Sequence, residues 1–247
     1  MDHEPLISII TITYNAASTI EPTLMSVASQ TWRGFEHIIV DGASSDDTLT
    51  LARRYPELRI LSERDGGLYD AMNKGIDLAR GKYLLFLNSG DAFHSNDSLA
   101  AYAERALKGD DIIYADTVIV NSARHIIAPR HLSAPQNLTF DSFAKGMLIC
   151  HQAFMVRKDL APKYDLQYRF SADYDWTVKC ILNSDPRRNT NLGIIAIDYL
   201  SDGLTDKNKL KSLRERYRIM THHYGTVRTL ANHITFIFRA LARKLRQ

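Results

Sequence analysis

Short apolar runs alternate with longer amphipathic stretches in the first part of the chain. The apolar runs are rich in Ile, Val and Leu, too short for helices, and typical of strands buried on both faces. The pattern predicts strands at 6–13, 35–40, 58–62 and 83–87. The stretches between them repeat at helical spacing, which predicts helices at about 18–28, 45–55 and 68–80. We also expect a capping box from Ser18 to Glu21, and a cap from Ser45 or Asp46.

This βαβαβαβ order predicts an α/β protein whose mostly parallel sheet is covered by helices on both faces. The second half is less regular. It predicts a helix at 97–107 and another from FSADYDW to about Asn183. Further strands are expected at 111–120, 151–157 and 193–200.

Polar residues follow each of the first four predicted strands. They are Thr13-Tyr14-Asn15, Asp41-Gly42, 63–67 (ERDGG) and Asn88-Ser89-Gly90-Asp91. In sheets of this kind, ligands bind beyond the carboxyl ends of the strands. One polar strand end is usually just a turn, but four at one edge favour a binding site.

Length and composition are those of one large α/β domain with an appendage. The chain has 247 residues, of which 45% are hydrophobic and 24% charged. The two cysteines, Cys150 and Cys180, fit no metal-ligand spacing and suit a reducing cytoplasm. The start, MDHEPLISIITITYN, is typical of a first strand rather than a signal peptide. No apolar stretch approaches the roughly 18 to 20 residues that span a bilayer, so we expect a cytoplasmic protein, soluble or peripheral.

The net charge of +3 hides an acidic body and a basic tail. Residues 205–247 hold eleven Lys/Arg and two acids, or +9, which leaves 20 basic and 26 acidic residues, or −6, in 1–204. Residues 227–246 carry an apolar stripe at helical spacing with five cations beside it. Such a helix lies on an anionic membrane, or packs on the body or a second subunit. Its aromatics form no stacking platform, which argues against nucleic acid.

The strand ends suggest a nucleotide site without a classical phosphate loop. There is no GxGxxG after the first strand and no GxxxxGK[ST] anywhere, which argues against dinucleotide dehydrogenases and P-loop NTPases. Asn15 and Asp41 carry an amide and a carboxylate suited to a nucleobase or ribose. Asp91 suits Mn²⁺ or Mg²⁺, which bind through one or two carboxylates plus substrate phosphates.

Several motifs, in this order and at these separations, carry a family resemblance. They are SIITITYN, VDGASSDDT, GGLYDAMNKGI, FLNSGD, HQAFMVRKDL and SADYDW. Together they resemble the inverting family 2 glycosyltransferases with the GT-A fold, over about residues 6–200. The most similar subgroup assembles bacterial surface polysaccharides such as colanic acid, O-antigen or capsule.

The resemblance implies a sugar-donor site at the strand ends. Thr13, Tyr14 and Asn15 would line the nucleobase pocket, and Asp41 would hydrogen-bond the base. In the stretch from Asn88 through Ser89 and Gly90, Asp91 would hold the metal that bridges the two phosphates. Asn88 stands where many members carry an acid, which puts metal affinity and donor identity in question but not the reaction class.

Asp173 in SADYDW is implied as the general base for the acceptor hydroxyl. Ala172 precedes it where the family carries an acid. Asp175 is the alternative, because Asp173 near a helix start can be only a cap. The implied reaction is a single displacement at the anomeric carbon with inversion, in which the metal neutralises the leaving diphosphate.

Other polar residues have both functional and structural interpretations. Asp70 and Asn73 lie one turn apart on a helix with Lys74, and either support the donor site or are solvated. His151 and Gln152 are expected on the acceptor side, where a structural histidine is the alternative. A third group, Thr205, Lys207 and Lys209, would close over the diphosphate.

The sequence therefore predicts a metal-dependent glycosyltransferase. It would move sugar from a nucleotide-sugar, with UDP expected, to a saccharide on a polyprenyl-diphosphate at the inner face of the cytoplasmic membrane. Two rivals stay open. A sugar-phosphate nucleotidyltransferase would usually carry a Gly-rich basic loop, which ITYNAAST lacks. A scaffold would bind nucleotide without catalysis. A homodimer is open as well.

Overall fold

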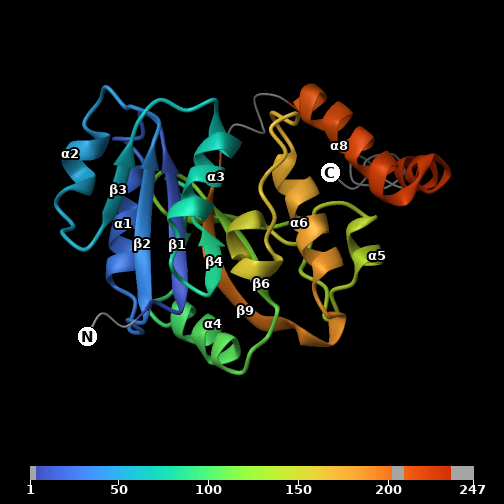
Figure 1. The fold of residues 1–247 in the computed structure, drawn as a ribbon, viewed down its shortest axis with the longest axis horizontal. Coiled ribbons are helices and arrows are strands. Elements are labelled where there is room, and N and C mark those ends of the chain that lie inside the picture. Colours follow the sequence, from blue (N-terminus) through green and yellow to red (C-terminus); the bar gives the residue numbers. More distant parts are fainter. Residues whose placement is uncertain (1–3, 202–208, 235–247) are drawn as a thin grey trace.

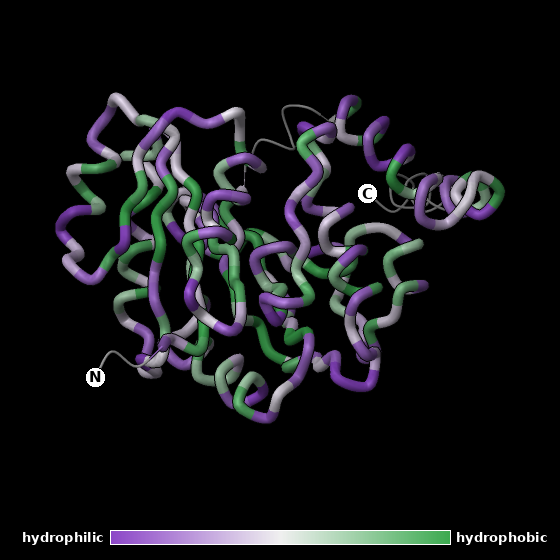
Figure 2. The backbone as a smooth tube through the Cα atoms, in the orientation of Figure 1, coloured by the Kyte–Doolittle hydropathy of each residue, from purple (hydrophilic) through white to green (hydrophobic). Residues whose placement is uncertain are grey.

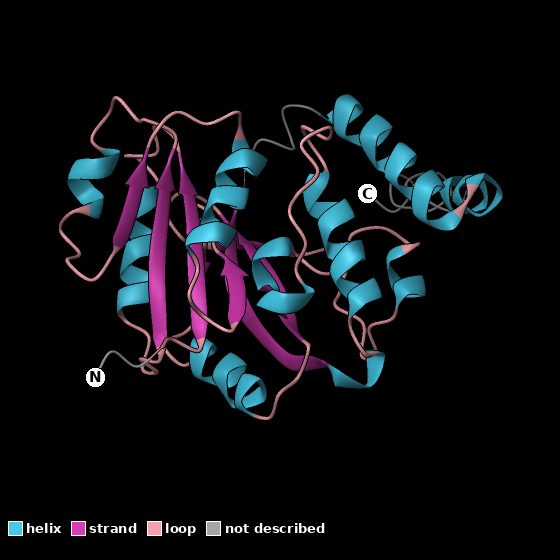
Figure 3. Ribbon diagram, in the orientation of Figure 1, coloured by secondary structure: helices cyan, strands magenta, loops and turns pink. Residues whose placement is uncertain are grey.

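The computed structural model describes residues 4–201 and 209–234 as a sheet flanked by helices (Figures 1 and 3). The strands are β1 (Ile7–Thr13), β2 (Phe35–Asp41), β3 (Arg59–Ser62), β4 (Tyr83–Phe86), β5 (Ala92–Phe93), β6 (Ile112–Val120), β7 (Ile126–Pro129), β8 (Phe154–Arg157) and β9 (Asn189–Leu200). The α-helices are α1 (Ile20–Ala28), α2 (Thr48–Ala52), α3 (Leu68–Leu78), α4 (Ser98–Leu107), α5 (Phe140–Phe143), α6 (Ala172–Asn183) and α8 (Lys209–Tyr224). Single 3₁₀ turns are η1 (His151–Ala153), η2 (Lys158–Leu160) and η3 (Pro186–Arg188).

The strands form one sheet in the order β3-β2-β1-β4-β8-β6-β9-β5, with β7 on the side of β6. The first four strands are parallel, with Ile7 of β1 opposite both Phe35 of β2 and Tyr83 of β4. After them, β8 is antiparallel to both β4 and β6, whereas β6 and β9 are parallel. The carboxyl ends of β1 to β4 therefore meet at one edge, as the alternating pattern predicts.

Alternate residues of β1 serve two cores, because side chains of a strand point to opposite faces. Ile7 and Ile9 pack with α1 and α4, whereas Ile10 and Ile12 pack with α3 and α6. Apolar strands consequently lie inside and polar loops outside (Figure 2). The strand predicted at 6–13 is buried on both faces, as its unbroken apolar run indicates.

Three local expectations were wrong. The N-cap position of helix α1 is Thr19 rather than Ser18, so Glu21 is the second residue of the helix and not the third. Thr19 makes no side-chain cap hydrogen bond, and the predicted capping box is therefore absent. Helix α2 covers only Thr48–Ala52 and has Asp47 at its N-cap position. Asp46 accepts from the N–H groups of Thr48 and of Ala17 in the loop after β1. The strand predicted at 151–157 begins at Phe154, since 151–153 form a 3₁₀ turn.

Helix α8 follows β9 along the chain and packs on α6. Its inner face buries Ile219 and Met220 in the core next to α6. A further helical stretch, 226–234, comes after it. Among the described residues, no helix is long and apolar enough to cross a bilayer.

Candidate active site

The loops after β1 and β2 are joined by hydrogen bonds. The backbone N–H of Asn15 donates to Ser44 Oγ at 2.8 Å, and Asn15 Oδ1 accepts from the N–H of Ser45 at 2.9 Å. Asn15 has a φ of +47°, a left-handed conformation that Asn tolerates better than most residues. Tyr14 beside it is 68% exposed. The predicted nucleobase residues thus lie on a rigid loop with an aromatic ring in solvent.

Asp41 ends β2 and is fully buried. Its carboxylate accepts hydrogen bonds from Thr13 Oγ1 (2.9 Å), Ser62 Oγ (2.7 Å), and both the N–H (2.9 Å) and Oγ (2.5 Å) of Ser44. Burial acts to raise the pKa of Asp41, but these hydrogen bonds outweigh it and hold the pKa below its ordinary value. Asp41 therefore stays ionised and ties three strand ends together.

The turn after β4 places Asp91 in a buried position. Gly90 has a φ of +100°, and a Cβ there would come within 2.7 Å of Leu200 Cδ2, so only glycine fits. Asp91 accepts hydrogen bonds from Leu200 N–H and Gln152 Nε2, both at 2.9 Å. Burial raises the pKa of Asp91 to about 7, although those hydrogen bonds and the charge of Arg124 act to lower it. Ser89 donates to Ile12 O, which fixes the turn against β1.

Asn88 and Asp91 offer oxygen atoms suited to a hard cation. Within the described part of the chain, Asn88 Oδ1 is buried without a hydrogen-bond partner. Each Asp91 oxygen accepts one hydrogen bond, which leaves a lone pair on each. No group of three or more His, Cys, Asp or Glu side chains in 4–201 and 209–234 is arranged around a metal position. The residues fit Mn²⁺ or Mg²⁺ only if substrate phosphates supply the remaining ligands.

The polar residues of α3 turn to different partners. Asp70 accepts from Gly66 N–H at 2.8 Å, and Lys74 Nζ contacts Glu63 Oε1 at 2.8 Å and Arg64 O at 2.9 Å. Asn73 uses both ends of its amide on the backbone of Tyr164, accepting from N–H at 2.7 Å and donating to O at 3.0 Å. Asp70 and Lys74 therefore order the loop after β3, and Asn73 anchors the segment before α6.

Asp173 lies in the first turn of α6 and is half-buried. Tyr69 of α3 donates its hydroxyl to Asp173 Oδ1 at 3.1 Å. Burial and this carboxylate raise the pKa of Tyr69, so its phenol stays protonated as a hydrogen-bond donor. One oxygen of Asp173 is thereby held in place across the space between two helices.

Asp175, the alternative base, is 2% exposed and lies between α6 and α8. His223 Nε2 lies 2.7 Å from its Oδ1, and Lys179 Nζ lies 2.6 Å from its Oδ2. Burial acts to raise the pKa of Asp175, but the hydrogen bonds from His223 and Lys179 lower it overall. The geometry thus favours Asp173 as the residue open to substrate and Asp175 as a tie to α8.

His151 belongs to an aromatic cluster. Its Nε2 lies 2.7 Å from Tyr164 OH, and Tyr164 stacks on Trp176 at 4.9 Å and on Tyr69 at 5.6 Å between ring centroids. Burial lowers the pKa of His151 to about 4, so the ring is neutral. Tyr69, Tyr164 and Trp176 were not identified from the sequence, although Tyr69 belongs to GGLYDAMNKGI and Trp176 to SADYDW.

Arg124 was also not identified. It donates to Gly90 O at 2.7 Å and lies 3.5 Å from Asp198 Oδ2, beside the turn that carries Asp91. It stands between β6 and β7, in a stretch with no helical or strand periodicity, so the sequence offers no signal for it.

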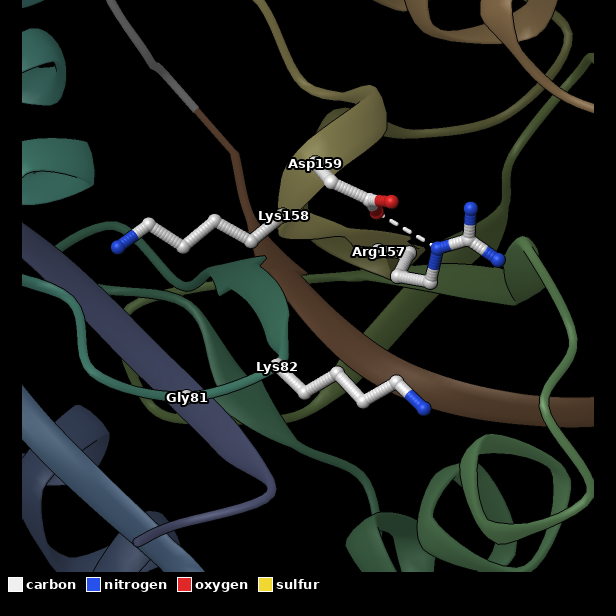
Figure 4. Close-up of a pocket in the computed structure, with 5 residues that line it drawn as sticks. All are labelled: Gly81, Lys82, Arg157, Lys158 and Asp159. Atoms are coloured by element: carbon white, nitrogen blue, oxygen red, sulfur yellow. Dashed lines mark hydrogen bonds and ion pairs between the residues drawn. The ribbon is translucent and has the colours of Figure 1, made fainter.

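A large cavity lies at the other end of β4, near Tyr83 rather than Phe86. It measures about 670 Å³ and is lined by Gly81, Lys82, Arg157, Lys158 and Asp159. Figure 4 shows the Lys82 and Lys158 side chains diverging, with Arg157 turned to Asp159. Arg157 also binds Asp111 at 2.8 Å. Because its cations do not converge, this cavity does not compete with the opposite edge as the active site.

Comparisons with known proteins identify the family of the chain. Residues 8–164 match the model of glycosyl transferase family 2. The chain belongs to this family. It is 36% identical to the PGL/p-HBAD biosynthesis glycosyltransferase of Mycobacterium tuberculosis, covering 85% of this chain and 84% of that protein. An uncharacterized glycosyltransferase of the same species is 33% identical, and the match covers 75% of this chain and 72% of that protein. The protein is therefore a glycosyltransferase.

Solved structures show that the fold is GT-A. S. aureus TarS 1-349 superposes with a TM-score of 0.71 at 19% identity, covering 93% of this chain and 72% of that one. The same TarS fragment in complex with UDP-GlcNAc gives 0.68 at 20% identity, covering 93% and 73%. The mannosyltransferase PcManGT of Pyrobaculum calidifontis, in complex with GDP-Man and Mn²⁺, gives 0.58 at 15% identity, covering 94% and 74%.

Proposed function

We propose that this glycosyltransferase moves a sugar with inversion from a UDP-sugar to a lipid-linked saccharide, with Asp91 as metal ligand and Asp173 as general base. The observation that carries the proposal is that the turn η1 links Asp91 to the residues around Asp173. Gln152 donates to Asp91, and His151 binds Tyr164, whose ring stacks on Tyr69, the partner of Asp173. One buried turn thus lies between the proposed donor and acceptor sides.

The nucleotide occupies the edge formed by β1 and β2. Tyr14 offers an exposed ring for the base, and Asn15 keeps its Nδ2 for a carbonyl of the base. Asp41, buried, ionised and held by four hydrogen bonds, supports the base indirectly, because it fixes the loops that carry Tyr14 and Asn15. The TarS complex with UDP-GlcNAc supports UDP, whereas the PcManGT complex with GDP-Man makes GDP the competing possibility.

The diphosphate lies at Asn88–Asp91. A bound Mn²⁺ or Mg²⁺ there would neutralise charge on the leaving diphosphate. Asp91 and Asn88 Oδ1 are the residues that would hold it, and Arg124 adds a cation beside the turn. Within residues 4–201 and 209–234 the turn offers one carboxylate, so a metal would bind together with the nucleotide rather than before it.

Asp173 acts on the acceptor. Its carboxylate takes the proton of the acceptor hydroxyl as that oxygen bonds to the anomeric carbon from the face opposite the diphosphate. The bond from the anomeric carbon to the diphosphate oxygen breaks in the same step, which inverts the centre. Tyr69 keeps Asp173 Oδ1 occupied, so the other oxygen is the proton acceptor.

The acceptor is a saccharide on a polyprenyl diphosphate used for bacterial surface polysaccharide, at the inner face of the cytoplasmic membrane. The support is the family resemblance and the basic C-terminal region. We propose residues 1–204 as the catalytic domain, with its nucleotide half at about 1–95, and 205–247 as a basic appendage. Thr205, Lys207 and the side chain of Lys209 lie outside the described part of the structure.

Transfer assays test these roles. UDP-, GDP- and dTDP-sugars are incubated with Mn²⁺, a saccharide acceptor and either wild type, Asp91→Asn or Asp173→Asn. We expect a UDP-sugar to be used, and each variant to lose about 10² to 10⁴ in rate. Asp159→Asn, at the opposite end of β4, is the matched control and keeps full rate. Full activity in both site variants would contradict the roles. UDP binding without transfer would indicate a scaffold, and nucleotidyl transfer to a sugar phosphate would indicate the other rival.

A further inference from the structure

Helix α8 has two unlike faces. The inner face docks on the body: Ser212 Oγ meets Ser171 Oγ at 2.9 Å, and His223 reaches Asp175. The outer face carries Leu210, Leu213, Arg214, Tyr217 and Arg218. Their spacing of three and four residues forms a stripe along one side of the helix.

This outer stripe is open to solvent. Leu210 is 77% exposed and Leu213 is 53% exposed, which is unusual for two leucines one turn apart. Together with His233 of the 226–234 stretch, the stripe lines a groove of about 380 Å³. Leu230 and Ile234 of that stretch are exposed too. Apolar side chains therefore gather on one outward surface at the C-terminal side of the molecule.

The exposed charges of α8 have one sign. Glu215 is the only acid of α8, and it turns inward, accepting from the backbone N–H groups of Arg169 (2.9 Å) and Phe170 (2.7 Å). No Asp or Glu follows it in the sequence. Lys211, Arg214 and Arg218 are left on the exposed side. A partner must therefore be anionic and must accept leucine side chains.

We propose that the outer face of α8, with 226–234, docks on an anionic lipid surface. Leucines entering the headgroup boundary with arginines at the phosphates suit such a surface. A second copy of the chain fits worse, since a two-fold contact would bring the same cations face to face. Nucleic acid fits worse because the leucines are the most exposed apolar residues of the stripe, and the ring of Tyr217 packs against His233.

Docking in this way would bring the active site to the bilayer. In Figure 1 the arrowheads of β1, β2 and β3 and the whole of α8 lie on the same, upper side of the molecule. The carboxyl edge of the sheet, where the sugar donor is proposed to bind, thus lies on the same side of the molecule as α8 in this view. This inference deepens the proposed lipid-linked acceptor, but its test needs no transfer reaction, so the two can fail separately.

The test is co-sedimentation of the full chain with vesicles of phosphatidylcholine, alone or with phosphatidylglycerol. We expect binding that requires phosphatidylglycerol and weakens with salt. Leu213→Gln/Arg214→Gln should lower the affinity at least about tenfold. The change removes one cation attracted to the anionic surface and one leucine side chain that is buried on binding, and the two losses add.

The matched control is Leu107→Gln/Lys108→Gln, the same leucine-cation pair on α4. Leu107 is 71% exposed, and α4 lies at the opposite, lower side of Figure 1. This variant should bind like wild type, and both variants should keep the wild-type unfolding midpoint. Equal vesicle binding by all three proteins, or none by wild type, would overturn the proposal. So would a dimer or an RNA complex that is lost in the α8 variant.

Discussion

The two sides of the active site are held together by different means. On the donor side, Asp41 is saturated by four hydrogen bonds from residues of three strand ends. On the proposed acceptor side, Asp173 accepts one side-chain hydrogen bond from within the described part of the chain, that of Tyr69, and the support around it is a stack of rings. A carboxylate that fixes structure is surrounded by donors, whereas the carboxylate that we propose as the general base keeps an oxygen open.

The largest expected effect on this comparison is the loss of stability in Asp41→Ala. Removing the carboxylate leaves the buried hydroxyl of Thr13 without its acceptor, together with the hydroxyls of half-buried Ser44 and exposed Ser62. We expect the free energy of unfolding to fall by about 3 kcal/mol. Urea unfolding measures it, and Asp173→Asn, which should leave stability within about 0.5 kcal/mol, is the contrast. If Asp173→Asn destabilises the protein as much as Asp41→Ala, the distinction is lost.

Each side buries a neutral histidine, and both histidines should lower the free energy of unfolding in acid. Asp91, whose pKa burial raises to about 7, acts in the opposite direction below pH 7. Burial lowers the pKa of His37 from 6.5 to about 3, and that of His151 to about 4. Between each of these pKa values and 6.5, the histidine is protonated in the unfolded chain but neutral in the folded chain. The histidines therefore lower the free energy of unfolding as the pH drops below 6.5. Each histidine should cost about 1.4 kcal/mol per pH unit in that window.

Unfolding free energies from pH 7.5 to 5 test this expectation. His37→Gln should flatten the profile by one histidine's share, since Gln has no proton to gain. Thr11 Oγ1, which lies 2.9 Å from His37 Nε2, still has Leu87 O as a partner at 2.7 Å. An unchanged slope in the variant would show that His37 is protonated or exposed in the native protein.

Tyr69→Phe should have the smallest effect and the most specific one. It removes the hydroxyl from Asp173 and keeps the ring that stacks on Tyr164. We expect kcat to fall about tenfold with the sugar-donor KM unchanged, because only the base is mispositioned. In an Asp173→Asn background the same change should cost nothing further. Tyr164→Phe, which loses its contact with His151 instead, controls for loss of a buried phenol. Additive effects of Tyr69 and Asp173 would refute the positioning role.

The alternation of strands and helices predicted most of the nucleotide half, because each element there is local and strongly patterned. It also placed Asn15, Asp41 and Asp91 at one edge, since parallel strands share their carboxyl ends. Helix limits were less predictable. Asp46, expected as a cap, bonds to Ala17 in another loop as well as to Thr48, and no local pattern records that choice.

The acceptor half could be predicted only in part. Asp173 was found through its motif, but its partner Tyr69 lies in a different helix, far along the chain. Asp175 is buried because α8 packs over it and His223 of α8 contacts its carboxylate. The apolar stripe over 227–246 does not predict which face of α8 packs on the body. Residues 235–246 of that stripe lie outside the described part of the structure, and the domain boundary at 204 stays a prediction.

Gly90 limits which substitutions the turn from Asn88 to Asp91 can accept under selection. An acidic side chain at position 90 would meet Leu200 and would occupy a left-handed backbone, so a library randomised there should return glycine. Asn88 is different: its Oδ1 is unengaged among the described residues, and aspartate has the same shape. A single substitution, Asn88→Asp, is therefore the accessible path to a second carboxylate, and directed evolution for tighter manganese use should find it before any other change in the turn.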